Sequence, residues 1–173
     1  MHLNIEIKAK CSNLEHVRTI LKSKNADYKG LDHQIDTYFK VPHGRLKLRE
    51  GNIEHALIFY QRSNQAGPKD SNVILYTNQP KPGLKAALQA ACGILVVVDK
   101  KREIYFIDNV KFHLDDVNNL GTYCEIEAID STGNLSREKL LEQCQDYMQL
   151  LGINDEDLVS CSYSDLILEK ELN

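Results

Sequence analysis

The sequence contains no apolar run that approaches the ~20 residues needed to span a bilayer, and it does not begin with the basic and then apolar pattern of a secretory signal peptide. Its five cysteines, Cys11, Cys92, Cys124, Cys144 and Cys161, are odd in number and widely spaced. This spacing argues against a disulfide framework or a zinc site and favours buried, reduced thiols. We therefore expect a cytoplasmic protein with no membrane partner.

The sequence also lacks a Gly-rich phosphate loop, a Walker lysine and a GxGxxG pattern. Any phosphate ligand would therefore have to be held by side chains. A net charge of −4 argues against general nucleic-acid binding. The basic strand faces described below also lack interleaved aromatic residues on which bases could stack, so we expect no nucleic-acid partner.

The chain of 173 residues is an ordinary length for one domain, and no low-complexity segment or linker divides it. We therefore treat residues 1–173 as a single domain. Alternating apolar and polar residues predict about eight strands, at 3–10, 34–41, 45–50, 54–62, 72–78, 94–107, 109–115 and 123–129.

Three helices are expected between these strands. The first opens at a capping box, Ser12 to Glu15; the second begins near Pro82 and ends before Gly93; the third is capped by Ser136 and runs to about residue 151. Strands dominate without regular βαβ alternation, which predicts an α+β fold with an antiparallel sheet and flanking helices. Eight strands can close into a β-barrel with a narrow lumen.

Several strands carry charges along one face. A row of charges is usually a solvated surface, so an open sheet with a wet face is one interpretation. However, neighbouring basic side chains repel unless an anion lies among them, since two unit charges 4 Å apart cost about 4 kcal/mol at an effective dielectric of 20. The grouped carboxylates would suit Mg²⁺ or Mn²⁺. The sets on one face are Glu6, Lys8 and Lys10; Arg45, Lys47 and Arg49; Lys100 and Arg102; Lys111, His113 and Asp115; and Glu125 and Glu127.

A basic lining with a carboxylate cluster is what a metal–polyphosphate ligand requires. In order along the chain, this pattern resembles the CYTH superfamily, or triphosphate tunnel metalloenzymes, and most closely its class IV adenylate cyclase-like branch. The segments that carry the resemblance are N-I-E-I-K-A-K from Asn4, G-R-L-K-L-R-E from Gly44, Y-Q-R from Tyr60, G-P-K-D-S from Gly67, V-D-K-K-R-E-I-Y from Val98, F-H-L-D-D-V-N-N-L-G from Phe112, Y-C-E-I-E from Tyr123 and S-Y-S-D-L from Ser162.

The resemblance implies an eight-stranded antiparallel closed β-barrel with a hydrophilic tunnel, and a small-molecule triphosphate as substrate, such as ATP, thiamine triphosphate or tripolyphosphate. It implies Mg²⁺ or Mn²⁺ as the cofactor. Metal ligands would be Glu6, Asp115, Glu125 and Glu127. Phosphate contacts would come from Lys8, Arg45, Lys47, Arg49, Arg62, Lys69, Lys100 and Arg102. No residue is marked as the catalytic one; Lys10 and Asp115 are the candidates, and Lys111 and His113 would line the tunnel.

One departure concerns the first Glu of the family's E-x-E-x-K signature, which is Asn4 in this chain. An amide oxygen can still reach a cation but brings no negative charge. The leading hypothesis is a class IV adenylate cyclase-like enzyme that converts ATP to cyclic AMP and pyrophosphate. A triphosphatase and, because of Asn4, a non-catalytic polyphosphate or nucleotide binder are the alternatives. The oligomeric state stays open, with a dimer among the options.

Overall fold

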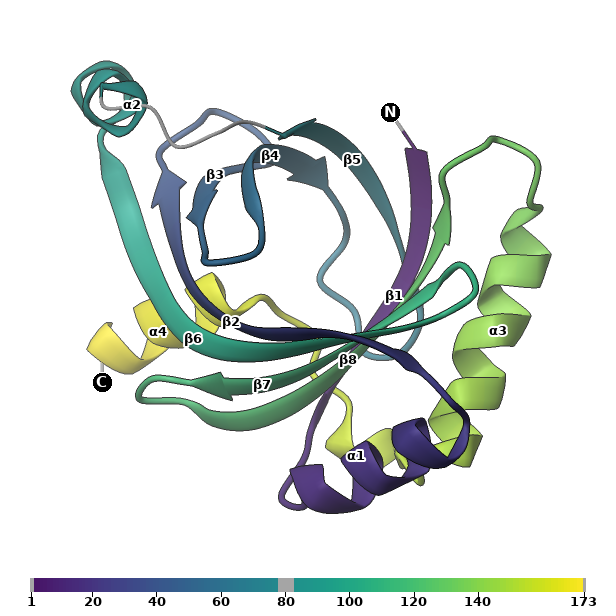
Figure 1. Cartoon of the computed structure of the whole chain (residues 1–173). Coiled ribbons are helices and arrows are strands. Elements are labelled where there is room, and N and C mark those ends of the chain that lie inside the picture. The colour runs from purple at the N-terminus through teal and green to yellow at the C-terminus, as the bar shows by residue number, and fades with distance from the viewer. Residues whose placement is uncertain (1, 78–82, 173) are drawn as a thin grey trace.

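The computed structural model describes residues 2–77 and 83–172 and contains eight strands (Figure 1). The strands are β1 (His2–Lys10), β2 (Asp27–Phe39), β3 (Arg45–Glu50), β4 (His55–Gln61), β5 (Lys69–Thr77), β6 (Ile94–Ile107), β7 (Val110–Val117) and β8 (Gly121–Asp130). The helices are α1 (Leu14–Ser23), α2 (Leu84–Cys92), α3 (Arg137–Leu150) and α4 (Tyr163–Leu172), with a short 3₁₀ turn at Asp155–Asp157.

All strand pairs are antiparallel, and the sheet closes on itself in the order β1-β5-β4-β3-β2-β6-β7-β8, because β1 pairs with both β5 and β8. The expected eight-stranded antiparallel barrel is therefore confirmed. Within the described ranges, no helix is long and apolar enough to span a bilayer.

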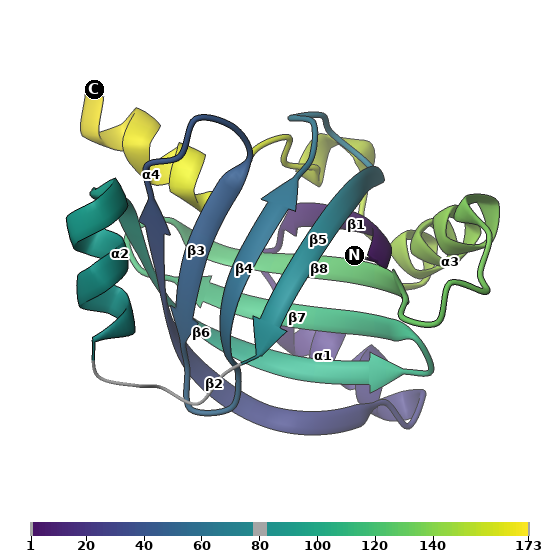
Figure 2. The ribbon, with the colours of Figure 1, turned by 90° about the horizontal axis from the view of Figure 1, so that it is seen from above.

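The main apolar core lies outside the barrel wall rather than within it. The outward faces of β1, β7 and β8 pack against α1 and α3, with Ile7, Phe112 and Ile126 among the fully buried residues. Val17 and Leu21 of α1 and Leu140 and Cys144 of α3 complete this layer. The helices thus cover one side of the barrel, and β3, β4 and β5 form the wall on the side away from α1 and α3 (Figures 1 and 2).

One helix start differs from the expectation. Asn13, not Ser12, is the N-cap of α1, and its side chain accepts a hydrogen bond from the backbone N–H of His16. The third helix is capped by Ser136 as predicted, through the backbone N–H of Lys139. The expected end of the fifth strand at Asn78 and the expected helix start near Pro82 lie outside the described residues.

Strand β2 begins at Asp27 rather than at Gln34. Residues 27–33 show little alternation of apolar and polar side chains, so the sequence pattern did not identify them as part of the strand. A register shift also interrupts their pairing with β6 between Tyr28 and Gly30. Gly30 has a φ of 125°, a conformation that side-chain-bearing residues rarely adopt.

Helix α4 is an additional element, because the sequence predicted only three main helices. Its start carries a reciprocal cap: Ser162 Oγ accepts the Asp165 backbone N–H, and Asp165 accepts the Ser162 backbone N–H. The capping pattern S-x-x-D was present in the sequence, but the apolar residues that follow it do not form a single stripe.

Candidate active site

The barrel register places the charged faces of the strands inside the lumen. Glu6 on β1 lies opposite Glu127 on β8, and Lys8 lies opposite Glu125. On the other side of β8, Lys111 of β7 is paired with Glu127. The charged strand faces, which could have belonged to an open, solvated sheet, therefore line a cavity of about 410 Å³ within the barrel.

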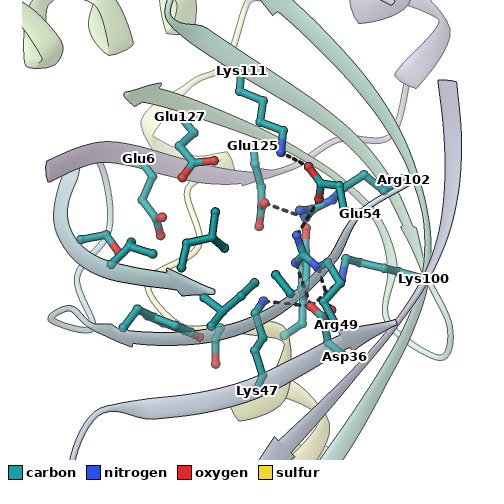
Figure 3. A pocket seen from close by; sticks show the side chains of 18 of the residues that line it. Glu6, Asp36, Lys47, Arg49, Glu54, Lys100, Arg102, Lys111, Glu125 and Glu127 are labelled. Carbon is teal, nitrogen blue, oxygen red and sulfur yellow. Dashed lines mark hydrogen bonds and ion pairs between the residues drawn. The ribbon is translucent and has the colours of Figure 1, made fainter. Parts of the chain in front are cut away.

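Most of the charged residues singled out in the sequence line this cavity (Figure 3). Those that do are Glu6, Lys8, Lys47, Arg49, Arg62, Lys100, Arg102, Lys111, Glu125 and Glu127. Lysines and arginines outnumber carboxylates in this set, so the lining is suited to an anionic ligand.

Asp36 of β2 is the centre of a cation cluster on one side of the cavity. Its carboxylate accepts hydrogen bonds from Lys47 and Lys100, both at 2.8 Å, and from Arg49 Nε at 2.8 Å. Burial alone would raise the pKa of Asp36, but Arg49, Lys100 and Lys47 hold it well below its usual range. Burial lowers the pKa of Lys100 to about 7, because the attraction of Asp36 only partly offsets the lost hydration.

A second cluster lies around Glu125 of β8. Its carboxylate is 2.8 Å from Arg102 Nη2, 2.9 Å from His113 Nδ1 and 3.3 Å from Lys8 Nζ. Burial opposes the charge of Glu125, but Arg102 and Lys8 lower its pKa well below the usual value. The same burial, with the charge of Arg102, lowers the pKa of His113 and favours the neutral imidazole. Glu125 is therefore the counter-ion of Arg102 and Lys8 in the cavity lining.

Asp115 is poorly placed for the metal role that the resemblance suggested. It is fully buried, does not line the cavity, and both its oxygens are engaged: Oδ1 by Arg102 Nε at 2.7 Å, and Oδ2 by Tyr163 Oη at 2.7 Å. It orients Arg102 and Tyr163. The Tyr163 ring in turn lies under Lys8, whose Nζ is 3.6 Å from the ring centroid.

Four other candidate residues lie outside the cavity lining. His113, expected to line the tunnel, is buried and contacts Glu125 instead. Lys10 is exposed at the end of β1, so the face it shares with Lys8 does not carry it into the cavity. Arg45 pairs with Asp165 of α4 at 2.7 Å. Lys69 is buried, and its Nζ lies 3.2–3.3 Å from the carbonyl oxygens of Gln65, Val159 and Ser160.

Glu6 and Glu127 are the acidic pair best placed to hold a divalent cation. They lie side by side on neighbouring strands and project into the lumen (Figure 3). Glu6 forms an ion pair with Arg62, and Glu127 accepts a hydrogen bond from the Asn4 amide. The Asn4 side-chain oxygen is buried and has no hydrogen-bond partner among the described residues, so it is a further oxygen donor beside the pair.

Within residues 2–77 and 83–172, no three His, Cys, Asp or Glu side chains converge closely enough to hold a metal by themselves. Mg²⁺ usually retains waters and is held by one or two carboxylates together with the substrate phosphates. Glu6, Glu127 and the Asn4 oxygen therefore fit a hard cation that binds jointly with a phosphate ligand.

Glu54, just before β4, is a charged lining residue that was not singled out from the sequence. It contacts Arg49 and Lys111. In the predicted strand 54–62 it shares a face with Arg62, but the residues between them on that face, Ala56, Ile58 and Tyr60, gave no sign of a charged lining. Asp36 lies in the predicted strand 34–41, but the sequence did not show whether its face lines the barrel or its rim. In the structure Asp36 is paired with Arg49 in the β2–β3 register, which places it in the lumen.

The cavity also has an apolar strip. Ala56 and Ile58 of β4 and Val73 and Leu75 of β5 line the wall formed by these two strands. A ligand with both an anionic chain and an apolar group can therefore contact charged and apolar surfaces within one cavity.

The molecule is thus a closed antiparallel barrel whose lumen is lined by lysines and arginines with carboxylates among them. The sequence matches the CYTH domain model over residues 2–163, and the chain belongs to the CYTH family.

One curated relative, named a putative adenylate cyclase, comes from Methanocaldococcus jannaschii. It is 32% identical over 69 residues, which span 40% of this chain and 39% of the relative. The similarity thus covers well under half of the relative's length.

Two solved structures share the fold over nearly the whole chain. The PH1012 protein from Pyrococcus horikoshii OT3 has a TM-score of 0.77 and 25% identity, covering 96% of this chain and 99% of its own. A putative adenylyl cyclase from Hippeastrum, described as revealing a dominant triphosphatase activity, has a TM-score of 0.63 and 13% identity, covering 100% and 97%.

Proposed function

We propose that this protein is a metal-dependent enzyme that acts on an organic triphosphate inside the barrel. The observation that carries the proposal is the lining itself, in which lysines and arginines from five strands or their ends surround one cavity beside the Glu6–Glu127 pair. Membership of the CYTH family supports the same ligand class.

The basic side chains bind the phosphates and offset their charge. Lys8, Lys47 and Arg62 line the cavity from β1, β3 and the end of β4, so they can contact a polyphosphate chain from several directions. Arg can contact two phosphate oxygens at once, whereas Lys acts as a compact point charge. Reactions at phosphorus depend mainly on such positioning and charge stabilisation.

Glu6 and Glu127, with the Asn4 side-chain oxygen, would hold Mg²⁺ or Mn²⁺. When bound, such a cation neutralises charge on phosphate oxygens as a Lewis acid. The Asn4 amide already donates a hydrogen bond to Glu127, so position 4 contributes to this side of the cavity without a carboxylate.

The first reaction to test is ATP cyclisation, in which the ribose 3′-hydroxyl attacks the α-phosphorus and pyrophosphate leaves. Two observations support it. The relative from Methanocaldococcus jannaschii is named a putative adenylate cyclase. The strip of Ala56, Ile58, Val73 and Leu75 provides apolar surface for a nucleoside, which an inorganic chain would leave uncovered.

The second candidate is hydrolysis, in which water attacks the terminal phosphorus. It is favoured by the Hippeastrum structure, which shares the fold and is described as having a dominant triphosphatase activity. The third candidate is binding without turnover, which the neutral Asn4 beside the acidic pair would favour.

The experiment is to incubate the purified protein with ATP, thiamine triphosphate and tripolyphosphate, each with Mg²⁺, with Mn²⁺ or with a chelator, and to identify the products. Cyclic AMP with pyrophosphate identifies a cyclase, and orthophosphate identifies a triphosphatase. Lys8→Gln must abolish the product if the activity belongs to the lumen. Binding without product supports the third candidate, and failure of the protein to bind any triphosphate would refute the proposal.

A further inference from the structure

Glu54 enters the lumen from the connection between β3 and β4. Its Oε2 lies 2.8 Å from Arg49 Nη1 and 3.0 Å from Gln34 Nε2, and its Oε1 pairs with Lys111 of β7 (Figure 3). The backbone N–H of Glu54 is bound to Asp32 of β2, and in the closed strand order only β6 lies between β2 and β7. The Glu54–Lys111 pair therefore links the β3–β4 connection to β7 inside the lumen.

The turn that carries Glu54 is held in place by a buried carboxylate. Asp32 is fully buried and accepts the backbone N–H groups of Asn52 at 2.5 Å, Ile53 at 2.9 Å and Glu54 at 3.0 Å. A Cβ at Gly51 would lie 2.6 Å from an Asp32 oxygen, so the close approach requires glycine. Because the backbone is anchored, Glu54 cannot readily leave the lumen by loop opening.

Glu54 differs from Asp36, the other carboxylate that binds Arg49. Asp36 sits within a strand, is 2% exposed and holds three cations against the wall. Glu54 is 25% exposed and reaches its partners through a longer side chain. Burial opposes its charge, but Arg49 and Lys111 hold the pKa of Glu54 well below its usual range, so it is anionic at neutral pH. It therefore occupies Arg49 and Lys111 as an anionic ligand group would.

We propose that Glu54 is a specificity-determining residue that limits the length of the polyphosphate chain the cavity accepts. This inference rests on the proposed function. A short chain is bound by the cations that Glu54 leaves available. A longer chain needs Arg49 and Lys111 as well, and it must displace a carboxylate whose backbone is fixed. Each additional phosphate that must bind Arg49 or Lys111 therefore contributes less binding free energy than it would in a cavity without Glu54.

The test measures dissociation constants of pyrophosphate, tripolyphosphate and tetrapolyphosphate by titration calorimetry with Mn²⁺, for the parent protein and for Glu54→Gln. The matched control is Glu50→Gln, because Glu50 is four residues away and pairs with Lys85 of α2 at 2.7 Å without lining the cavity. We expect Glu54→Gln to bind tetrapolyphosphate about tenfold more tightly, with a smaller gain for tripolyphosphate and none for pyrophosphate. Glu50→Gln should match the parent.

The same gain for all three ligands would mean that Glu54 acts only through overall charge, and it would overturn the length limit. Unchanged or weaker binding in Glu54→Gln would overturn it as well. If Glu54→Gln does not fold, Glu54→Asp decides: its retracted carboxylate should relax the discrimination in part, and parent-like selectivity contradicts the inference. Absence of polyphosphate binding in the parent and all variants would instead refute the proposed function.

Discussion

The two faces of β8 have different roles: one packs against the helices, and the other lines the lumen. Ile126 points outward and is fully buried in the apolar layer under α1 and α3, whereas its neighbours Glu125 and Glu127 line the lumen. The same division holds on β1, where Ile5 and Ile7 pack outward and Glu6 and Lys8 face inward. Successive side chains of a strand point to opposite faces of the sheet. Adjacent residues of β1 and β8 therefore differ in role: the outward one stabilises the fold, and the inward one lines the lumen.

This comparison separates two kinds of substitution. A change on the outer face should reduce the free energy of unfolding and leave ligand contacts intact. A change on the inner face should alter binding at a smaller cost in stability, because the inner groups are already held in networks with several partners. The four predictions below test or refine this division.

The largest effect on stability is expected for Ile126→Ala. It leaves a cavity in the layer between β8 and the helices and should cost about 2–5 kcal/mol in unfolding free energy. Chemical denaturation measures the loss, and the dissociation constant of tripolyphosphate should not change in the folded variant. The control is Ile74→Ala on β5, where Ile74 is 52% exposed and little should be lost. Equal losses at both positions would contradict the division between the faces.

The largest effect on function is expected for Glu127→Gln. It removes one carboxylate of the Glu6–Glu127 pair, so the affinity for the divalent metal should fall by about a hundredfold or more. Titration of product formation with Mn²⁺ gives the apparent affinity, and thermal melting shows that the fold persists. Glu138→Gln on the exposed surface of α3 makes the same chemical change away from the lumen. Parent-like metal dependence in Glu127→Gln would remove Glu127 from the proposed metal site.

Proton uptake on binding is expected from Lys100. Its pKa is lowered to about 7, so in most molecules of the free protein the Lys100 amine is neutral at pH 8. A bound polyphosphate favours the charged ammonium and raises this pKa, so binding at pH 8 should take up a proton, and the affinity should fall as the pH rises above about 7. Calorimetry in buffers of different ionisation enthalpy gives the number of protons. Lys100→Met should lose the uptake; undiminished uptake in Lys100→Met would contradict the assignment.

The smallest effect is expected for Asn4→Glu. A second carboxylate beside Glu127 replaces the hydrogen bond that Asn4 now donates, so the two charges repel until a cation binds. The thermal stabilisation by Mn²⁺ should therefore be greater in Asn4→Glu than in the parent, with up to about tenfold tighter metal binding. Asn72→Glu, on the exposed outer side of β5, is the matched control. A metal response equal to that of the parent would show that position 4 does not face the cation.

Much of the fold was predictable because strand alternation is a local property. The strand at residues 94–107 was predicted with its observed bounds. The charged faces of β6 and β8 line the cavity as grouped, and those of β1 and β3 do so except for Lys10 and Arg45. The closed barrel rested on resemblance, since alternation alone fits an open sheet equally well. Deciding between them required the β1–β8 pairing, which joins residues far apart in the sequence.

The site was less predictable where side chains contact one another across the lumen. Strand parity placed Lys8 and Lys10 on one face, but it could not show that the strand leaves the cavity before Lys10. It could not show that Arg102 and Tyr163 engage both oxygens of Asp115. Glu54 shares a face with Arg62 in the predicted strand 54–62, but the residues between them on that face, Ala56, Ile58 and Tyr60, gave no sign that it is part of a charged lining.

Metal-dependent stabilisation by a triphosphate tests the central claim most directly. Melting temperatures are recorded with tripolyphosphate alone, with Mn²⁺ alone and with both. At about 100 times the dissociation constant, the ligand with metal should add about 2.7 kcal/mol to the unfolding free energy, and clearly more than either component alone. Lys8→Gln should reduce the shift. A protein whose melting is indifferent to tripolyphosphate with and without Mn²⁺ would contradict the account.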